Sequence, residues 1–312
     1  MSSISNVARS HTSVRLKMQS PKKSLFALIL TLALLIPAIA EPQPFHGIAW
    51  SPHKIVPGSP CLFTVIVTGS LTALHAKWMG HKIVFFPSGQ HLWYGLAGVD
   101  VEAKPGNYKL ELEAVLPDGQ STHDERDVLV EPAHYKTESL RVPDRFVQPD
   151  PETLRRIEAE RKVKDAAFSH AIAEPEWSGT FVAPIDSTVS EGFGTRRTFN
   201  GKLASIHRGL DYHAKPGSPV AAANSGEVVL AQALFYEGNC VIIDHGQQFM
   251  TLYMHLSRLD VTEGEKVKKG QEIGLSGATG RATGPHLHTA VRWQGAYLDP
   301  AQLWALPLPR MQ

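Results

Sequence analysis

Short runs of apolar and β-branched residues, set apart by turn residues, fill the segment 45–132. In Tyr108–Val115 apolar and polar residues alternate, which predicts a strand with one buried face and one solvent-exposed face. Runs of a similar kind cover Cys61–Thr68, Lys82–Phe86 and Trp93–Leu96. Several short strands at such intervals predict an antiparallel, all-β unit over this segment.

The length of this unit fits a small sandwich, so we expect an N-terminal immunoglobulin-like domain over residues 45–132. Its histidines show no metal-ligand spacing and are expected at the surface or at strand ends; they are His46, His53, His75, His81 and His91. His123 and Asp127 are four positions apart, but they lie in a polar stretch that we interpret as a turn. No glycine lies between these two residues and no further set of histidines is near them, so this pair is expected to lie on the surface.

A charged segment, residues 133–178, is expected to link this unit to a second domain. Asp150 followed by Pro151 is typical of a helix start, which predicts a helix over about 151–168. Its apolar residues Leu154, Ile157 and Phe168 could pack on a neighbour. The helix is either a solvated spacer or a strut that fixes two domains around a cleft, and its charge pattern favours the spacer.

Residues 179–306 are rich in glycine and predict a second all-β unit. The strand candidates are Gly226–Ala231, Cys240–Asp244, Phe249–Tyr253 and His286–Arg292. The stretches 217–226 and 264–274 resemble each other and the hairpins of barrel-sandwich (biotinyl/lipoyl-like) folds, which indicates a weak internal duplication. The fold class that follows is all-β, with two β domains and a helical linker between them.

The first forty residues have the features of a signal peptide. Basic residues precede an apolar run over Leu25–Ile36, and Ala38-Ile39-Ala40 is a small-x-small cleavage signal before Glu41. The run is short for a membrane span, and Glu41 rather than a Cys directly follows the cleavage point, so a lipoprotein anchor is not indicated. We therefore expect a protein exported to the periplasm or the cell wall, without a stable membrane anchor; an uncleaved anchor is the alternative.

Charge and cysteine content exclude some partners and sites. The formal net charge is +1, and residues 1–40 hold five basic residues and no acidic one, so the chain after cleavage would carry −4. This balance argues against bulk electrostatic binding to nucleic acid. The two cysteines, Cys61 and Cys240, fall in separate apolar runs and are expected to be buried thiols, which excludes a cysteine-based zinc site.

Candidate chemistry gathers in the second unit. His286 and His288 are two positions apart in a predicted strand, so their imidazoles point to the same face. His207 and Asp211 lie upstream in His-Arg-Gly-Leu-Asp, and His255 lies in Tyr-Met-His-Leu. Neutral imidazoles with one carboxylate are the ligands of a catalytic zinc, which keeps one position open for water.

The spacing of His207 and Asp211 requires a bend in the backbone. In an extended strand, residues i and i+4 lie about 13 Å apart, too far to share one ion. Gly209 lies midway between them and tolerates a sharp turn. A long helix, which would also align these residues, is disfavoured by Gly209 and Pro216.

The whole second unit resembles the lysostaphin-type, or LytM-like, zinc endopeptidases over about residues 181–303. The motifs that carry the resemblance are Phe193-Gly-Thr-Arg, His207-Arg-Gly-Leu-Asp-Tyr, Gly217-Ser-Pro-Val, Asp244-His-Gly, Tyr253-Met-His-Leu-Ser, Gly270-Gln-Glu-Ile-Gly and Ser276-Gly-Ala-Thr-Gly-Arg-Ala-Thr-Gly-Pro-His-Leu-His. The resemblance implies that the domain 179–306 is a LytM-like peptidase domain.

The resemblance also implies the roles of the five residues. His207, Asp211 and His288 would hold one Zn²⁺, and His255 and His286 would be the catalytic histidines beside the metal water. Thr289 stands where the family often has an aromatic residue, and strand alternation should turn it away from the metal. His213 and His245 lie near the motifs but off the pattern, and they are expected to be structural or surface residues.

The implied substrate is the peptide stem or cross-link of bacterial peptidoglycan, and an export signal agrees with that location. Zinc would lower the pKa of its bound water towards 7, and His255 or His286 would take up the proton. Because metal binding needs neutral imidazoles, we expect zinc and activity to be lost below about pH 5 to 6.

Two alternatives remain open at this point. A lipoyl- or biotinyl-like carrier would present Lys268 or Lys269 in a hairpin, although Val267 and Gly270 do not make a convincing attachment turn. A non-catalytic LytM-like regulator of another wall hydrolase would lack some of the metal set, whereas all five positions are filled here.

Overall fold

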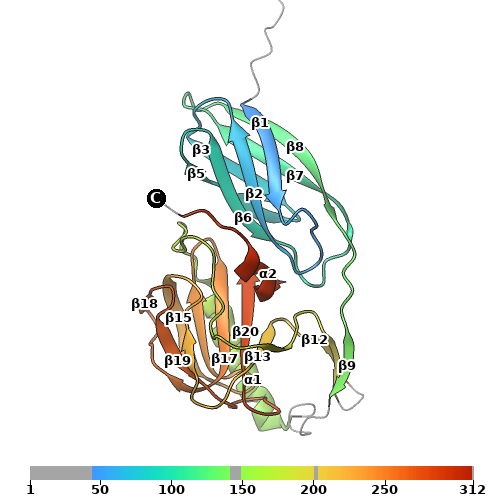
Figure 1. Ribbon diagram of the computed structural model, residues 1–312, viewed down its shortest axis with the longest axis vertical. Coiled ribbons are helices and arrows are strands. Elements are labelled where there is room, and N and C mark those ends of the chain that lie inside the picture. The colour runs from blue at the N-terminus through green and yellow to red at the C-terminus, as the bar shows by residue number, and fades with distance from the viewer. Residues whose placement is uncertain (1–43, 141–148, 200–202, 311–312) are drawn as a thin grey trace, which may run out of the picture. The chain divides into compact units, whose positions relative to one another are not determined.

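The computed structural model describes residues 44–140, 149–199 and 203–310, and it is nearly all β, with two helices in these ranges (Figure 1). The predicted signal segment lies outside the described residues. Within them, none of the helices has the length and apolar character needed to cross a bilayer. The all-β fold class predicted from the sequence is confirmed.

Residues 45–130 form two antiparallel four-stranded sheets. One sheet has the order β1-β2-β6-β5 and the other β4-β3-β7-β8. The strands are β1 (Phe45–Ser51), β2 (Pro60–Val67), β3 (Ala73–Trp78), β4 (His81–Val84), β5 (Phe86–Ser88), β6 (Leu92–Gly98), β7 (Gly106–Val115) and β8 (Ser121–Val130). Phe63 of β2 and Trp78 of β3 pack edge to face across the two sheets, with ring centroids 5.1 Å apart. The immunoglobulin-like assignment stays a prediction, and this division of strands supports it.

Two local predictions for this region are wrong. The expected single strand Lys82–Phe86 is divided between β4 and β5, which belong to different sheets. The division falls at the buried Phe85, whose backbone N–H donates to the carbonyl of Leu74. His123 and Asp127 lie on strand β8 rather than in a turn, because β8 pairs with β7 along its whole length. Both side chains are exposed, as a surface assignment requires.

The second region is built on a sheet whose main path runs β10-β13-β20-β17-β16-β15-β18, with β14, β19 and β21 joined at its sides. These strands are β10 (Val189–Glu191), β13 (Leu210–His213), β14 (Pro219–Ala221), β15 (Gly226–Leu234), β16 (Gly238–Asp244), β17 (Phe249–Leu259), β18 (Lys266–Val267), β19 (Glu272–Ser276), β20 (His286–Trp293) and β21 (Ala296–Leu298). Helix α2 (Pro300–Ala305) follows, with Asp299 as its N-cap. All four strands expected from the sequence are present.

The segment expected to be a linker contributes a strand that the sequence does not predict. Strand β9 (Thr137–Leu140) pairs in parallel with β11 (Arg196–Phe199), which pairs with β12 (Leu203–Ile206) to complete a three-stranded sheet. Next to β9, the Tyr135 hydroxyl donates to the carbonyl of Pro57. The linker is therefore tied to both regions. The predicted domain boundaries at 132 and 179 stay a prediction.

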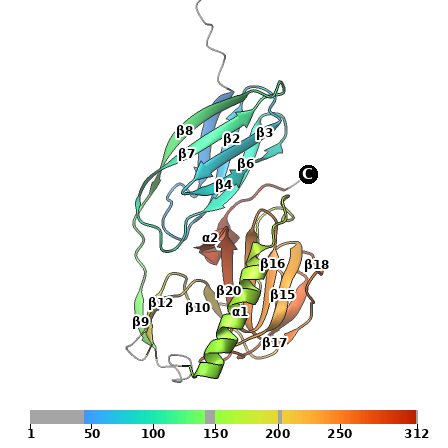
Figure 2. The same ribbon diagram turned by 180° about the vertical axis from the view of Figure 1, so that it is seen from behind.

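Helix α1 (Pro151–Ser169) begins and ends within one residue of the predicted helix, and Asp150 is its N-cap. The Asp150 carboxylate accepts hydrogen bonds of 2.9 Å from the backbone N–H groups of Glu152 and Thr153. The helix contacts strand β15, and it lies over the sheet in the rear view (Figure 2).

Specific contacts tie α1 to the turn between β15 and β16. Lys164 forms an ion pair with Glu237, and Glu160 accepts a 2.7 Å hydrogen bond from the backbone N–H of Phe235. Phe168 packs under the Arg292 guanidinium, whereas Leu154 stays exposed. One side of α1 is thus anchored to the sheet while most of its residues are exposed, and its role as a spacer stays a prediction.

Both cysteines are buried and free, as expected. Burial raises the pKa of the Cys61 and Cys240 thiols well above the ordinary value, so both stay protonated at neutral pH. They serve as small apolar core residues.

Candidate metal centre

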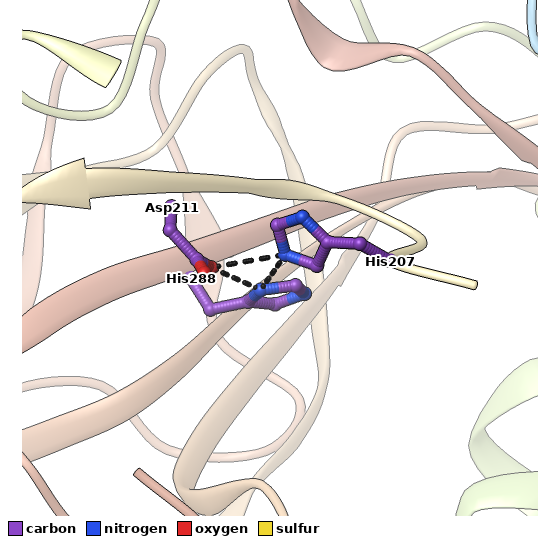
Figure 3. A group of neighbouring side chains, drawn as sticks. All are labelled: His207, Asp211 and His288. Atoms are coloured by element: carbon purple, nitrogen blue, oxygen red, sulfur yellow. Dashed lines mark hydrogen bonds and ion pairs between the residues drawn. The ribbon is translucent and has the colours of Figure 1, made fainter. Parts of the chain in front are cut away.

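Two neighbouring strands place the central pair of side chains. Asp211 on β13 lies directly opposite His288 on β20, and directly opposed residues of an antiparallel pair project to the same face. His207 follows the end of β12 and comes to the same place from the loop that leads into β13 (Figure 3). The sheet register therefore brings together residues that are 77 and 81 positions apart in the chain.

The three side chains form a tight cluster. His207 Nε2 lies 3.1 Å from Asp211 Oδ1 and 3.1 Å from His288 Nδ1, and His288 Nδ1 lies 2.6 Å from Asp211 Oδ1. All three ligand atoms lie within 4.8 Å of one another. Donors about 2.0–2.1 Å from a tetrahedral zinc lie about 3.3 Å apart, so the two spacings of 3.1 Å are close to those that zinc requires, while the 2.6 Å spacing is that of a hydrogen bond.

Gly209 permits this arrangement through close packing rather than through an unusual backbone angle. A Cβ atom at this position would lie 2.3 Å from the carbonyl oxygen of Thr289 and 2.6 Å from His288 Nε2. Gly209 is thus required here, as the sequence predicts, but because of its missing side chain rather than for a sharp bend. Any side chain here would push the loop away from β20 and His288.

Hydrogen bonding and charge prepare the three groups to bind a cation. His207 Nδ1 lies 2.9 Å from the carbonyl oxygen of Gly192, which can only accept, so Nδ1 carries the proton and Nε2 keeps its lone pair. Burial opposes ionisation of Asp211, but hydrogen bonds and charge from His207 and His288 hold its pKa well below the ordinary value. Burial chiefly lowers the pKa of His288. Aspartate binds metal as the ionised carboxylate, and histidine binds it as the neutral imidazole through a free nitrogen lone pair.

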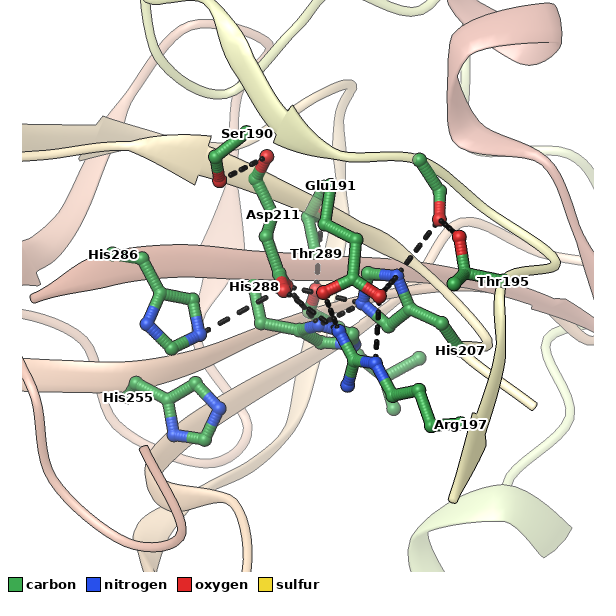
Figure 4. A network of polar contacts seen from close by, with 12 residues as sticks. Ser190, Glu191, Thr195, Arg197, His207, Asp211, His255, His286, His288 and Thr289 are labelled. Carbon is green, nitrogen blue, oxygen red and sulfur yellow. Dashed lines mark hydrogen bonds and ion pairs between the residues drawn. The ribbon is translucent and has the colours of Figure 1, made fainter. Parts of the chain in front are cut away.

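His255 stands beside this cluster because strand β17 is bulged at this residue. Tyr253 pairs with Val241 and Leu256 with Asn239, so β17 holds one extra residue there, and His255 adopts φ +62°. Its ring centroid lies 4.7 Å from that of His286 and 6.1 Å from that of His288. The bulge places the imidazole on the face of the sheet that carries the cluster (Figure 4).

Backbone carbonyls fix the orientation of both outer histidines. His255 Nδ1 lies 2.8 Å from the carbonyl oxygen of Thr279, and His286 Nδ1 lies 2.8 Å from that of Gly284. Each Nδ1 therefore donates, and each Nε2 is left as an acceptor. Burial, with smaller contributions from His288 and His286, lowers the pKa of His255 to about 3, so its ring is neutral at neutral pH.

A charged pair that the sequence does not predict, Arg197 and Glu191, lies behind the cluster. Arg197 on β11 places Nη2 3.1 Å from Asp211 Oδ2, and its Nε lies 2.6 Å from Glu191 Oε1 (Figure 4). Glu191 on β10 also lies 3.7 Å from His207 Nδ1. Neither residue has a characteristic spacing from the histidines, and the only sequence signal was that Arg197 follows the Phe193-Gly-Thr-Arg motif.

The remaining sequence candidates lie away from the cluster. His213 is exposed at the end of β13, while His245 is buried and lies 2.7 Å from both Ser225 O and Thr251 Oγ1. Thr289 is buried and donates to the carbonyl of Leu252. Lys269 donates to the carbonyl of Thr180. These contacts assign structural roles to His245 and Thr289.

Comparisons with known proteins agree with this geometry. Residues 205–300 match the family described as Peptidase family M23, and this range includes the five predicted site residues His207, Asp211, His255, His286 and His288. The peptidoglycan DD-endopeptidase ShyA of Vibrio cholerae is 46% identical over 108 residues, which cover 34% of this chain and 25% of the relative. The DD-carboxypeptidase/endopeptidase Mpg of Neisseria meningitidis is 38% identical over 137 residues, covering 44% and 31%.

A crystal structure of a Pseudomonas aeruginosa protein attributed to peptidase M23 is similar over a longer range. It has a TM-score of 0.62 and 29% identity, over 80% of this chain and 95% of that one. The likeness to the curated relatives is restricted, since the matched segments span less than a third of their lengths. Within that segment the assignment is direct, and the chain contains a peptidase family M23 domain of the LytM-like type.

Proposed function

We propose that this protein is a zinc-dependent endopeptidase that hydrolyses peptide bonds in the stems or cross-links of bacterial peptidoglycan. The observation that carries the proposal is the cluster of His207, Asp211 and His288, whose ligand atoms lie within 4.8 Å of one another. Two imidazoles and one carboxylate form the three-ligand set of catalytic zinc sites, which leaves a position for water or substrate.

The bound zinc would polarise the scissile carbonyl and lower the pKa of its water. The protein's own part is proton transfer beside that water. His255 is neutral and presents an acceptor Nε2, since its Nδ1 donates to Thr279 O. It can therefore take up a proton and return it to the leaving amine.

His286 is the second candidate for this proton transfer. Its Nε2 lies 3.9 Å from Asp211 Oδ1, and its ring stands next to that of His255. Two acceptor nitrogens on one side of the metal ligands allow one ring to accept a proton while the other, once protonated, donates a hydrogen bond to a developing oxyanion.

The substrate and location are proposed from the relatives. Both named relatives are peptidases, one of them named for peptidoglycan, and the first forty residues have the sequence features of an export signal. We propose that the protein acts in the periplasm or the cell wall on a peptide substrate.

Metal analysis and wall digestion together test this function. The protein purified without residues 1–40 is expected to hold one zinc per chain and to release new peptide termini from purified peptidoglycan. A chelator should abolish release, and added zinc should restore it. Mass spectrometry of the released fragments identifies the bond that is cleaved.

Two outcomes would contradict the proposal in different ways. A protein that binds no stoichiometric zinc would exclude a metallopeptidase and favour a regulator of another hydrolase. A zinc-loaded protein that releases no termini from walls of several chemotypes would leave the metal site intact and exclude the peptidoglycan substrate.

A further inference from the structure

We propose that Arg197, held by Glu191, is a positioning residue that fixes the carboxylate of Asp211 for metal binding. The inference rests on the proposed metal site and adds a residue to its support. It concerns how the site keeps its shape, since Arg197 acts through Asp211 rather than on the substrate.

Arg197 contacts the side of Asp211 that faces away from the two histidines. Oδ1 of Asp211 lies against His207 and His288, whereas Oδ2 lies 3.1 Å from Arg197 Nη2. The two oxygens of one carboxylate are thus divided between the metal cluster and the guanidinium. This division favours a carboxylate that presents only Oδ1 to an ion and cannot rotate to present Oδ2.

The register of the sheet makes a cation necessary at this place. Glu191 on β10 lies opposite Asp211 on β13, so two carboxylates project from adjacent positions of neighbouring strands. Like charges directly opposite each other are destabilising. Arg197 lies between them and binds both, which converts a repulsive pair into a bridged one.

Glu191 in turn fixes Arg197. Nε and Nη2 of the guanidinium contact the two oxygens of Glu191 in a forked arrangement, which a planar guanidinium can make and an ammonium cannot. All three side chains are largely buried, with exposed fractions of 17% for Arg197, 19% for Glu191 and 12% for Asp211. Buried charges are tolerated when they are paired and hydrogen-bonded, as they are here.

The opposite charges of Arg197 and Glu191 explain why both residues, and not an arginine alone, suit a position beside a metal ligand. An unpaired guanidinium beside a ligand would compete with the cation for the charge of Asp211. Glu191 offsets the charge of Arg197, so Asp211 keeps its negative charge for the ion while its position is fixed.

Strand β11 supplies a matched control. Arg196 precedes Arg197, and successive residues of a strand point to opposite faces, so Arg196 projects away and is exposed. Arg196→Gln removes the same charge from the same strand without touching Asp211. Arg197→Lys keeps the charge of Arg197 but cannot reproduce the fork.

The experiment measures the dissociation constant for zinc by competition with a chromophoric chelator, and the visible spectrum of the cobalt(II)-loaded protein. For Arg197→Gln we expect zinc affinity to fall by about 10- to 100-fold, the range typical of residues that orient a metal ligand. The cobalt bands should change because the Asp211 ligand is displaced. Arg197→Lys should give a smaller loss, and Arg196→Gln should match the wild type in both measurements.

Zinc affinity and cobalt bands of Arg197→Gln equal to those of the wild type would overturn the inference while leaving the metal site in place. Should Arg197→Gln not fold, judged by its circular dichroism, Arg197→Lys decides the matter by the same two measurements. A wild-type protein without zinc affinity would overturn the metal site itself and this inference with it.

Discussion

Asp211 Oδ1 and His288 Nδ1 lie 2.6 Å apart because strands β13 and β20 pair with these two residues directly opposite each other. A slip of one of these strands by one residue would turn its side chain to the other face of the sheet and separate the two groups. The cluster of His207, Asp211 and His288 is therefore set largely by backbone pairing, and only His207 reaches it from a loop.

Removing a cluster residue is expected to remove the metal. His288→Ala should reduce bound zinc to well below one per chain and lower activity by more than about 100-fold, since changes to residues that merely orient ligands already cost up to that much. Zinc content and peptide release from purified walls measure the two effects. The control is His213→Ala, an exposed histidine on β13 that should leave both unchanged. Full zinc occupancy in His288→Ala would contradict the ligand assignment.

Removing His255 should separate chemistry from metal binding. In His255→Ala we expect zinc content to stay at one per chain, while kcat falls by about 10²- to 10⁴-fold, the usual contribution of a general acid or base. The substitution removes the acceptor Nε2 of His255, which would take up the proton. It leaves the three residues of the cluster in place, because His255 is not one of them. A wild-type kcat would assign the proton transfer to another group, and loss of zinc would assign His255 to the metal site.

The sequence predicted two parts of the cluster from short, local spacing. His286 and His288 are two apart on one strand, and His207 and Asp211 flank a glycine whose absent side chain the packing requires. Each of these relations is visible within a few positions of the chain, but the prediction that the distant segments share one site came from the resemblance to the LytM-like family.

What the sequence could not show are contacts without local spacing. Glu191 and Arg197 meet Asp211 only after β10, β11 and β13 are assembled. Strand β9 is four residues long and pairs with β11, about 59 positions further along the chain. Helix α1 is mostly polar, so its anchoring through Lys164 and Glu237 leaves no amphipathic pattern to read.

The anchoring of α1 can be tested through stability. Lys164 and Glu237 form an ion pair in which both side chains are largely buried, and the Glu237 carbonyl accepts the backbone N–H of His255. We expect Lys164→Ala to lower the free energy of unfolding by about 1–3 kcal/mol, between the values for exposed and fully buried pairs. Urea denaturation measures this change.

Arg161 on the same helix provides the matched control for Lys164. It pairs with Glu158 and Asp165, but its side chain is 58% exposed and its charge is screened by water, so Arg161→Ala should leave the free energy of unfolding nearly unchanged. Equal effects of the two substitutions would show that α1 gains nothing from the contact with Glu237.

Stability should fall in mild acid because His245 is buried in the neutral form. Burial lowers the pKa of His245 from 6.5 to about 4, and its ring is held between Ser225 O and Thr251 Oγ1. Between these two pKa values the unfolded chain binds a proton that the folded protein does not, so stability decreases as pH falls below 6.5 and levels off below about 4. The expected loss from this residue is about 2 kcal/mol between pH 7 and pH 5.

Urea denaturation of the wild type and of His245→Gln at pH 7 and pH 5 isolates this contribution. The amide of Gln can hydrogen-bond to both neighbours but does not titrate, so the variant should be less stable at pH 7 and lose less stability on acidification. Other titrating groups affect both proteins equally, so the difference between the two pH dependences is the quantity that decides. Identical pH dependences would contradict this prediction. They would mean that His245 takes up its proton in the folded protein as readily as in the unfolded chain, although its ring is buried and hydrogen-bonded.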